Sequence, residues 1–517
     1  MLENSLLMFL LALLPIIWLI VALSVLKLPA HIASVFALFI AIIEAVFFWN
    51  LPFISALTAS LEGFVMALWP IIIVIIAAVF TYNLTVYTKN MDIIKKLFTS
   101  VNSDARVLVI LIGWCFGGFL EAIAGFGVAI AIPSSMLYAL GFNPITAILA
   151  CLVANGCPTM FGSIGIPTTT LASITSLNPN SLAFIQTLQV ALLLFISPYI
   201  MVMITGKGFK ALKGVMGFVT VASLSFVIPE ILAAKFVSPE LTIIIASIVS
   251  LICTFMYAKK MNIKDTTYLM EIAHDDQELS FKKIITAFSP FLLIFVLLLL
   301  TSKLVPFING PLSSIKSTFI IYQGVNPNPY TITWINTPGV LIMISGIIGG
   351  FIQKCSFKEQ MGVLKDTIIQ MSKTMITMLS VLGCAKVMGY SHMVTTISSF
   401  LILVTGTYYP LVSPVIGAIG TFVTGSGTSS QVLFGNIQLQ AANALNINEY
   451  WLVAANSLGT SAGKMLSPQS IAIGCAACGL VGKDGEILKK IFKFAILYLV
   501  LMAFIIYFGY NIFMIFA

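Results

Sequence analysis

Glu121 is the residue in this chain most able to carry chemistry. It lies inside a long apolar stretch, residues 107–140, that is interrupted by glycines. A carboxylate inside a membrane-spanning segment is energetically costly, so such a residue is first interpreted as part of a functional site. Desolvation disfavours its charged form, so this group could exchange a proton near neutral pH. The alternative is a neutral, hydrogen-bonded glutamate with a structural role. We predict that Glu121 binds and releases a proton.

A run of hydroxyl side chains interrupts a second apolar stretch, residues 410–445, with the letters TGSGTSS. Hydroxyls and free backbone N–H groups at the start of a half-helix suit a carboxylate ligand. Close packing of small residues between helices is the alternative. The run is not a nucleotide-binding loop, because it lacks the G-K-[ST] ending and no strand precedes it. The predicted binding residues here are Thr424, Ser426, Thr428, Ser429 and Ser430.

Lys464 is a cation within a later apolar run, in the motif GKMLSPQS. It either attracts an anionic ligand or pairs with Glu121 and neutralises that charge. Three other charged residues of apolar stretches are interpreted without a site: Lys386 as a side chain that snorkels to the interface, and Glu44 and Glu230 as residues near helix ends that face water. The predicted binding residues of the motif are Lys464, Ser467 and Gln469.

The two interrupted stretches look like copies of each other. GGFLEAIAGFGVAIAIP returns as GTFVTGSGTSSQVLFG, with Gly125 and Gly425 at an offset of 300, and Asn155 matches Asn456 at 301. Broken segments at corresponding places in two halves are the best sequence pointer to a transporter's binding site. We expect the asparagines to pin the broken helices, with substrate contact as the alternative. Gly125, Gly127, Asn155 and Asn456 join the predicted binding set.

Composition places these segments in a membrane. Of 517 residues 59% are hydrophobic and 9% charged, with a mean hydropathy of +1.08, whereas about 25% of residues are charged in soluble proteins. We interpret the net charge of +8 as an excess of lysines in the cytoplasmic loops of a membrane protein, and not as a patch that binds nucleic acid. The eight cysteines are scattered, and the single C-x-x-C, Cys475 to Cys478, lacks a second pair. We therefore predict no metal and no cofactor.

The pattern of apolar runs predicts an all-α integral membrane protein. About twelve spans accompany the two interrupted segments, which are re-entrant hairpins or pairs of short spans. The run 6–26 is expected to be one retained helix, and 145–171 and 450–475 are among the runs long enough to span the membrane. Lysine clusters, with Arg106 among them, fall on one face, which is then cytoplasmic, and both termini lie outside.

The same assignment of membrane spans gives the two halves of the chain opposite directions in the membrane. Inverted-topology repeats place a site near the midplane, where broken helices meet. The predicted domains are N-terminal helices in 1–62, a first inverted repeat in 63–205, connecting helices with a cytoplasmic loop in 206–334, and a second inverted repeat in 335–517.

The motif-bearing stretches resemble the lactate permease family. The resemblance rests on FLEAIAGFGVAIAI, GFNP and AN…FGSIGIP in the first half, and on FVTGSGTSSQVLFG, AANS, GKMLSPQSIAI and GLVG in the second. It implies import of L-lactate, and often D-lactate or glycolate, with protons. Two positions depart from the family pattern: Gly427 stands where an acid is usual, and GFGVA stands where GFGAP is usual. A change of coupling or substrate is therefore open.

These observations together predict a secondary transporter of the prokaryotic plasma membrane that carries L-lactate and related 2-hydroxymonocarboxylates with protons. Its partners would be the carboxylate, protons and membrane lipid, with no nucleic acid, and a homodimer stays open. The first alternative is a sodium-coupled carrier of dicarboxylates or other organic anions; an anion channel is the second. We predict no enzyme, because none of the three histidines pairs with an intramembrane acid in the sequence.

Overall fold

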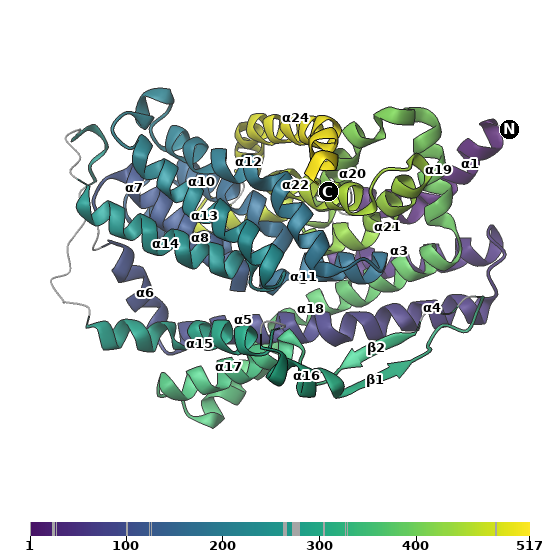
Figure 1. Ribbon diagram of the computed structural model, residues 1–517, viewed down its shortest axis with the longest axis horizontal. Helices are drawn as coiled ribbons and strands as arrows, with labels where there is room; N and C mark the ends of the chain where they lie inside the picture. The colour runs from purple at the N-terminus through teal and green to yellow at the C-terminus, as the bar shows by residue number, and fades with distance from the viewer. Residues whose placement is uncertain are drawn as a thin grey trace.

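The computed structural model shows a protein built almost entirely of helices (Figure 1). It describes residues 2–22, 26, 28–99, 102–123, 125, 127–261, 266–270, 280–302, 305–325, 327, 329–480 and 483–516. Most of the predicted cytoplasmic loop, residues 262–265 and 271–279, therefore lies outside the described residues. Within the described residues, eleven helices are long and apolar enough to cross a membrane. The prediction of an all-α membrane protein with about twelve spans is confirmed.

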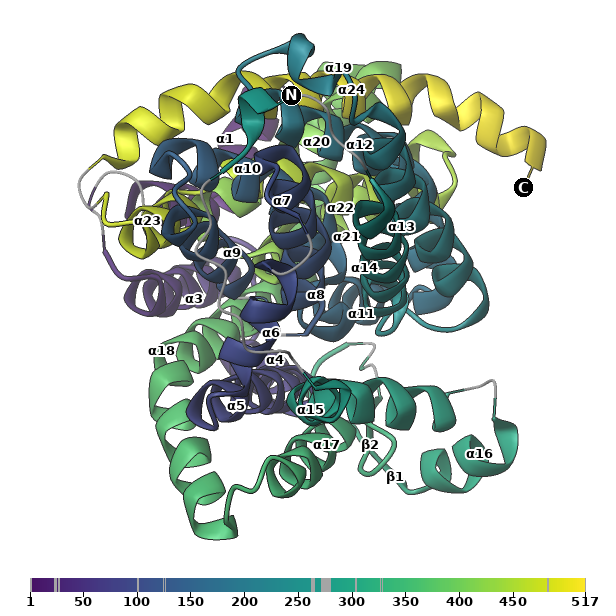
Figure 2. The ribbon, with the colours of Figure 1, turned by 90° about the vertical axis from the view of Figure 1, so that its left-hand side faces the viewer.

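One part of the molecule is a layer of long helices lying side by side, seen along the bottom of Figure 1 and below the rest in Figure 2. We call it the α4–α18 layer. It consists of α4 (Phe53–Met66), η2 (Ala67–Ile72), α5 (Ile73–Tyr87), α15 (Phe281–Leu300), α17 (Pro338–Ile352) and α18 (Phe357–Tyr390). A short helix and an antiparallel hairpin flank it: α16 (Pro306–Ser314), β1 (Lys316–Phe319) and β2 (Tyr330–Thr333). Helix α3 (Ala30–Phe47) packs along α18.

The second part is a bundle that contains the interrupted segments, and we call it the broken-helix bundle. Its first half comprises α7 (Ala105–Leu108), η3 (Val109–Phe116), α8 (Gly117–Ile123), α9 (Val128–Ala139), α10 (Pro144–Gly156), η4 (Cys157–Phe161), α11 (Gly162–Thr175), α12 (Pro179–Thr205), η5 (Phe209–Leu212), α13 (Met216–Phe236) and α14 (Thr242–Lys260). Helix α6 (Asn90–Thr99) leads into it from the layer, and η6 (Thr266–Tyr268) follows it.

The second half of the bundle comprises α19 (Met393–Thr405), η7 (Gly406–Tyr408), α20 (Tyr409–Thr424), α21 (Gly427–Leu445), α22 (Glu449–Leu466), α23 (Pro468–Ala477) and α24 (Asp484–Phe516). The N-terminal run forms two short helices, α1 (Leu2–Ala12) and α2 (Leu14–Ile20). The prediction of one helix over 6–26 is wrong. Pro15 lies at the start of α2, where its fixed φ and missing N–H favour a new first turn.

The two predicted interruptions are confirmed. Gly125 and Gly127 have φ of 53° and 87° between α8 and α9, and Gly425 has φ of 69° between α20 and α21. Glycine takes this left-handed conformation without steric penalty, so it ends one half-helix and lets the next begin in a new direction. Ser426 then caps α21 by accepting a hydrogen bond from the Ser429 N–H at 3.2 Å.

Two further apolar runs, which the sequence predicted as spans, are also broken. The first turns between η4 and α11, where Ser163, Ile164 and Gly165 have φ of 47°, 60° and 74°. The second breaks between α22 and α23 at Ser467, because Pro468 lacks the N–H that would continue the helix. Each half of the bundle therefore carries two broken segments. The inverted direction of the halves and the domain boundaries stay predictions.

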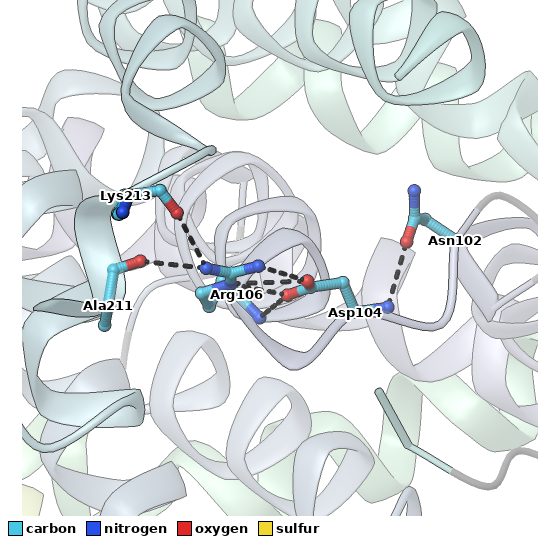
Figure 3. Close-up of polar contacts among 5 residues, drawn as sticks. All are labelled: Asn102, Asp104, Arg106, Ala211 and Lys213. Carbon is cyan, nitrogen blue, oxygen red and sulfur yellow. Dashed lines mark hydrogen bonds and ion pairs between the residues drawn. The ribbon is translucent and has the colours of Figure 1, made fainter. Parts of the chain in front are cut away.

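Arg106 lies inside the protein rather than among the loop lysines with which the sequence grouped it. Its guanidinium donates to the Asp104 carboxylate, with an Nη2–Oδ2 distance of 2.7 Å, and to the backbone carbonyls of Ala211 and Lys213 (Figure 3). It also lies 4.2 Å from the centre of the Tyr268 ring. We call this set the Arg106 clamp. It fastens the start of α7 to the connection between α12 and α13.

Three other charged residues contradict their predicted surroundings. Glu44 and Glu230 do not face water: both are buried, on α3 and α13, and their carboxylate oxygens have no hydrogen-bond partner. Lys386 does not snorkel freely, because its ammonium lies 2.7 Å from the buried carboxylate of Glu62, and its side chain is only 21% exposed. The Tyr390 hydroxyl donates to the same carboxylate. The sequence located these residues near helix ends, but neighbouring helices cover the ends.

Candidate functional site

A cavity of about 270 Å³ lies where the breaks of the bundle meet α18 and the start of α3. Its wall includes seven of the residues predicted from the sequence: Glu121, Gly127, Thr424, Ser426, Thr428, Lys464 and Gln469. Both halves of the bundle contribute, although the two groups are some 300 positions apart in the chain. Residues at the breaks, such as Gly127, Gly425 and Ser426, line this space.

Glu121 is placed by the second broken segment of its own half. The side-chain amide of Asn155, on α10, donates to Glu121 Oε2 at 2.7 Å. A Cβ on Gly162 would lie 2.4 Å from Oε1, so only glycine leaves room for the carboxylate there. The carboxylate is 4% exposed and borders the cavity. Asn155 itself does not line the cavity, and its role in the structure is to hold Glu121.

Lys464 joins the two broken segments of the other half. Its side chain is 7% exposed, and its ammonium donates to the Gly425 carbonyl at 3.1 Å. No ion pair joins Lys464 to Glu121, although both border the cavity. The backbone carbonyl at the end of α20 is an orphan acceptor of that helix. Lys464 therefore satisfies this carbonyl and holds the break in place.

The hydroxyls of the predicted run, which ends α20 and begins α21, divide between the cavity and the packed interior. Thr424, Ser426 and Thr428 border the cavity. Ser429 and Ser430 do not: Ser430 donates to the Gly417 carbonyl at 2.8 Å, and the Ser429 hydroxyl is buried without a partner. A helix turns about 100° per residue, so adjacent serines cannot share one face. The prediction included the whole run, and the structure brings only part of it to the cavity.

The remaining predicted residues surround the breaks. Asn456 donates to the Gln431 side chain at 2.8 Å, inside the packing of α21 on α22. Ser467 accepts from the Ser470 N–H at the start of α23. A Cβ on Gly125 would lie 2.1 Å from the Ser163 hydroxyl, and one on Gly425 would lie 2.1 Å from Gln469 Oε1. The two glycines therefore occupy matching close approaches, one in each half.

Sequence reasoning missed a third wall of the cavity. It comes from outside the bundle: Lys373, Thr374 and Thr377 on α18, and His31 at the start of α3. The bundle itself adds Thr159, Ser163 and Ser470. No role was predicted for Lys373 from the sequence. Its place on the cavity wall depends on how α18 packs against the breaks of the bundle.

The cavity combines one carboxylate with several cationic or neutral donors. Glu121 can hold or release a proton, while Lys464, Lys373 and His31 favour a negative ligand, and Thr424, Ser426 and Thr428 can donate to oxygen atoms. Ligand pockets for drug-sized molecules are about 300–1,000 Å³. A cavity just below this range suits a small organic anion better than a large one.

This chain is similar to one protein family and to several known proteins. The model of the family described as L-lactate permease matches residues 8–513. An L-lactate permease of Streptococcus iniae is 43% identical over 449 residues, which cover 87% of this chain and 94% of the relative. The glycolate permease GlcA of Escherichia coli K12 is 33% identical over 523 residues, 95% of this chain and 93% of the relative. The crystal structure of the Alcanivorax borkumensis YdaH transporter aligns with a TM-score of 0.35 and 15% identity, over 80% of this chain and 86% of that one.

Proposed function

The chain belongs to the L-lactate permease family, and from this premise we propose that it imports L-lactate and related 2-hydroxymonocarboxylates, D-lactate and glycolate among them, by proton symport. It is a multi-pass membrane transporter. Relatives named as L-lactate and glycolate permeases support the substrate class. We further propose that it acts in the plasma membrane with both termini outside.

The observation that carries the proposal is the cavity, which is small, lined by hydroxyls and cations, and bordered by one buried carboxylate. A 2-hydroxymonocarboxylate has one carboxylate for the cations and one hydroxyl for Thr424, Ser426 or Thr428. Glu121 then supplies the coupling. A proton on Glu121 removes its negative charge from the cavity, so the anionic substrate and the proton bind best together.

Movement of the bundle against the α4–α18 layer would expose the cavity to each side in turn. This part of the proposal is supported by the composition of the wall, because residues of both parts border one cavity. Broken helices that meet at a central site are common in transporters built from inverted repeats. The proton would be released from Glu121 on the inner side, and the transporter would then return to the outer side without substrate.

Uptake into proteoliposomes tests the proposal. With an inward proton gradient and no sodium, we expect transient accumulation of labelled L-lactate that collapses with a protonophore. Glu121→Gln should abolish accumulation against a gradient while lactate–lactate exchange continues, because the amide fills the same space but cannot cycle a proton. Glu359→Gln, which removes an exposed carboxylate at the start of α18, is the matched control and should accumulate normally.

Accumulation by the Glu121→Gln variant at the wild-type level would show that the proton binds elsewhere.

One observation favours a second candidate, a carrier coupled to sodium or selective for another organic anion. Gly427 borders the cavity where the family resemblance leads us to expect an acid, and a Cβ there would lie 3.1 Å from Thr159 Cγ2. Uptake that requires sodium, or that favours a dicarboxylate over lactate, would support this candidate and reject proton-coupled lactate transport.

A further inference from the structure

Lys373 is a cation without a partner on the wall of the transport cavity. It lies near the middle of α18, which runs over 34 residues from Phe357 to Tyr390. Its side chain is exposed and borders the cavity. Within the described part of the chain, its ammonium makes no ion pair and no hydrogen bond. A lysine on a membrane-crossing helix is rare and needs compensation, so an unpaired one suggests a ligand.

The other two lysines of the region are already engaged. Lys464 is buried and donates to the Gly425 carbonyl at 3.1 Å. Lys386, further along α18, pairs with Glu62 at 2.7 Å. Each of these two ammonium groups therefore already has a contact that holds the fold. Lys373 has no such contact among the described residues, so all three of its N–H donors are available to an anion.

The surroundings of Lys373 suit a carboxylate with a neighbouring hydroxyl. Thr377 lies one turn later on the same face of α18, and it borders the cavity together with Thr374. The backbone carbonyl of Lys373 accepts the Thr377 hydroxyl proton at 2.9 Å, which leaves the hydroxyl oxygen as an acceptor. Glu121 borders the same cavity and is the one carboxylate among its described lining residues. An anion beside Lys373 would therefore share the cavity with this acid, which carries no charge when it is protonated.

We propose that Lys373 is the residue that binds the carboxylate of the transported anion, while Lys464 secures the break between α20 and α21. This inference rests on the proposed function for the identity of the anion. It adds that the α4–α18 layer supplies the charged contact and the broken-helix bundle supplies hydroxyls and the proton site. A bound substrate would then bridge the two parts. The alternative is that Lys373 binds no ligand, with its methylene groups along apolar surface and its ammonium in water.

The test compares four variants by half-saturation of lactate exchange in proteoliposomes, an exchange that needs no proton gradient. Lys373→Gln should raise the half-saturation concentration by about 10- to 100-fold, the range expected for losing one charge-assisted hydrogen bond. Lys373→Arg should recover most of the affinity. Lys365→Gln, an exposed lysine two turns earlier on α18 that does not border the cavity, is the matched control and should behave as wild type. Lys464→Gln should lower the amount of folded protein more than it changes affinity.

Thermal protection by L-lactate, glycolate and succinate, measured for each purified variant, separates the two proposals. If lactate exchange is normal in Lys373→Gln, the inference is wrong and the proposed function stands. If Lys464→Gln alone loses affinity while its melting profile is unchanged, the assignment of the two lysines is reversed and the inference is again wrong. If succinate but not lactate protects the wild type, and Lys373→Gln loses that protection, the inference stands and the proposed substrate falls. If no carboxylate protects the wild type, both are rejected.

Discussion

Arg106 and Glu121 are both buried in the broken-helix bundle, yet their surroundings differ. The Arg106 guanidinium has the Asp104 carboxylate, two backbone carbonyls and the Tyr268 ring as partners. Glu121 accepts a hydrogen bond from the Asn155 amide and borders a cavity. A buried charge with a full set of partners stabilises one arrangement of the chain. A buried acid left partly free is available to exchange a proton or to meet a ligand.

Glu230 and Glu44 extend the comparison to groups with no partner. Both carboxylates are buried and none of their oxygens accepts a hydrogen bond. Such a group lowers stability unless it is neutral, and even a neutral acid carries an unsatisfied hydroxyl. Three kinds of buried ionisable group therefore occur among the described residues: fully partnered at Arg106, partly partnered at Glu121, and without a partner at Glu230.

The largest effect on stability is expected at the satisfied site. Arg106→Met removes the cation and leaves the buried Asp104 carboxylate and two carbonyls without donors, which should reduce stability by about 3–5 kcal/mol. Apparent melting temperature in detergent is the measurement. The control is Lys213→Gln, because Lys213 contributes its backbone carbonyl to the clamp and its side chain is exposed. Equal melting of Arg106→Met and wild type would mean that the clamp contributes no stability.

The opposite sign is expected at the unsatisfied site. Glu230→Met replaces a buried carboxyl group of similar size by an apolar chain and removes two orphan oxygens, so it should raise stability by about 1–3 kcal/mol. Glu230→Gln keeps polar atoms in the same place and should gain less, which makes it the matched control. A fall in stability of Glu230→Met would show that the carboxyl group has a partner in solution. Unchanged lactate uptake is also expected, since Glu230 does not border the cavity.

Local backbone chemistry explains which parts of the site were predictable. Gly425 ends α20 and Gly127 precedes α9 where their positions in the sequence indicated a break, because positive φ at glycine is a local property. The break at Ser163 and Ile164 was not visible, since a β-branched residue at φ of 60° is imposed by packing. There Gly165 lies against the Pro239 backbone, and a Cβ would be 2.8 Å from that carbonyl oxygen. This contact joins segments far apart in the chain.

Burial of charge was the least predictable property. A membrane-segment map gives the depth of a residue along a helix but not the neighbours around it. Glu230 lies close to the end of a predicted span, and the packing of α13 on α12 and α14 covers it. Lys373 was missed for the same reason, because the sequence does not reveal that α18 packs with Lys373 on the wall of the cavity.

The smallest effect on stability is expected at Glu121, and it decides between the two roles that the sequence left open for this residue. In Glu121→Gln the amide oxygen can still accept from Asn155, and the glycine at position 162 leaves the same space, so stability should change by less than about 1 kcal/mol. A structural glutamate would instead behave like Arg106, with a large fall in melting temperature. Lactate accumulation and melting temperature should both be measured in this variant. Loss of accumulation with an unchanged melting temperature assigns Glu121 to proton coupling. Melting and accumulation lost together would assign it to the fold, because a site that only holds helices cannot be removed without loosening them.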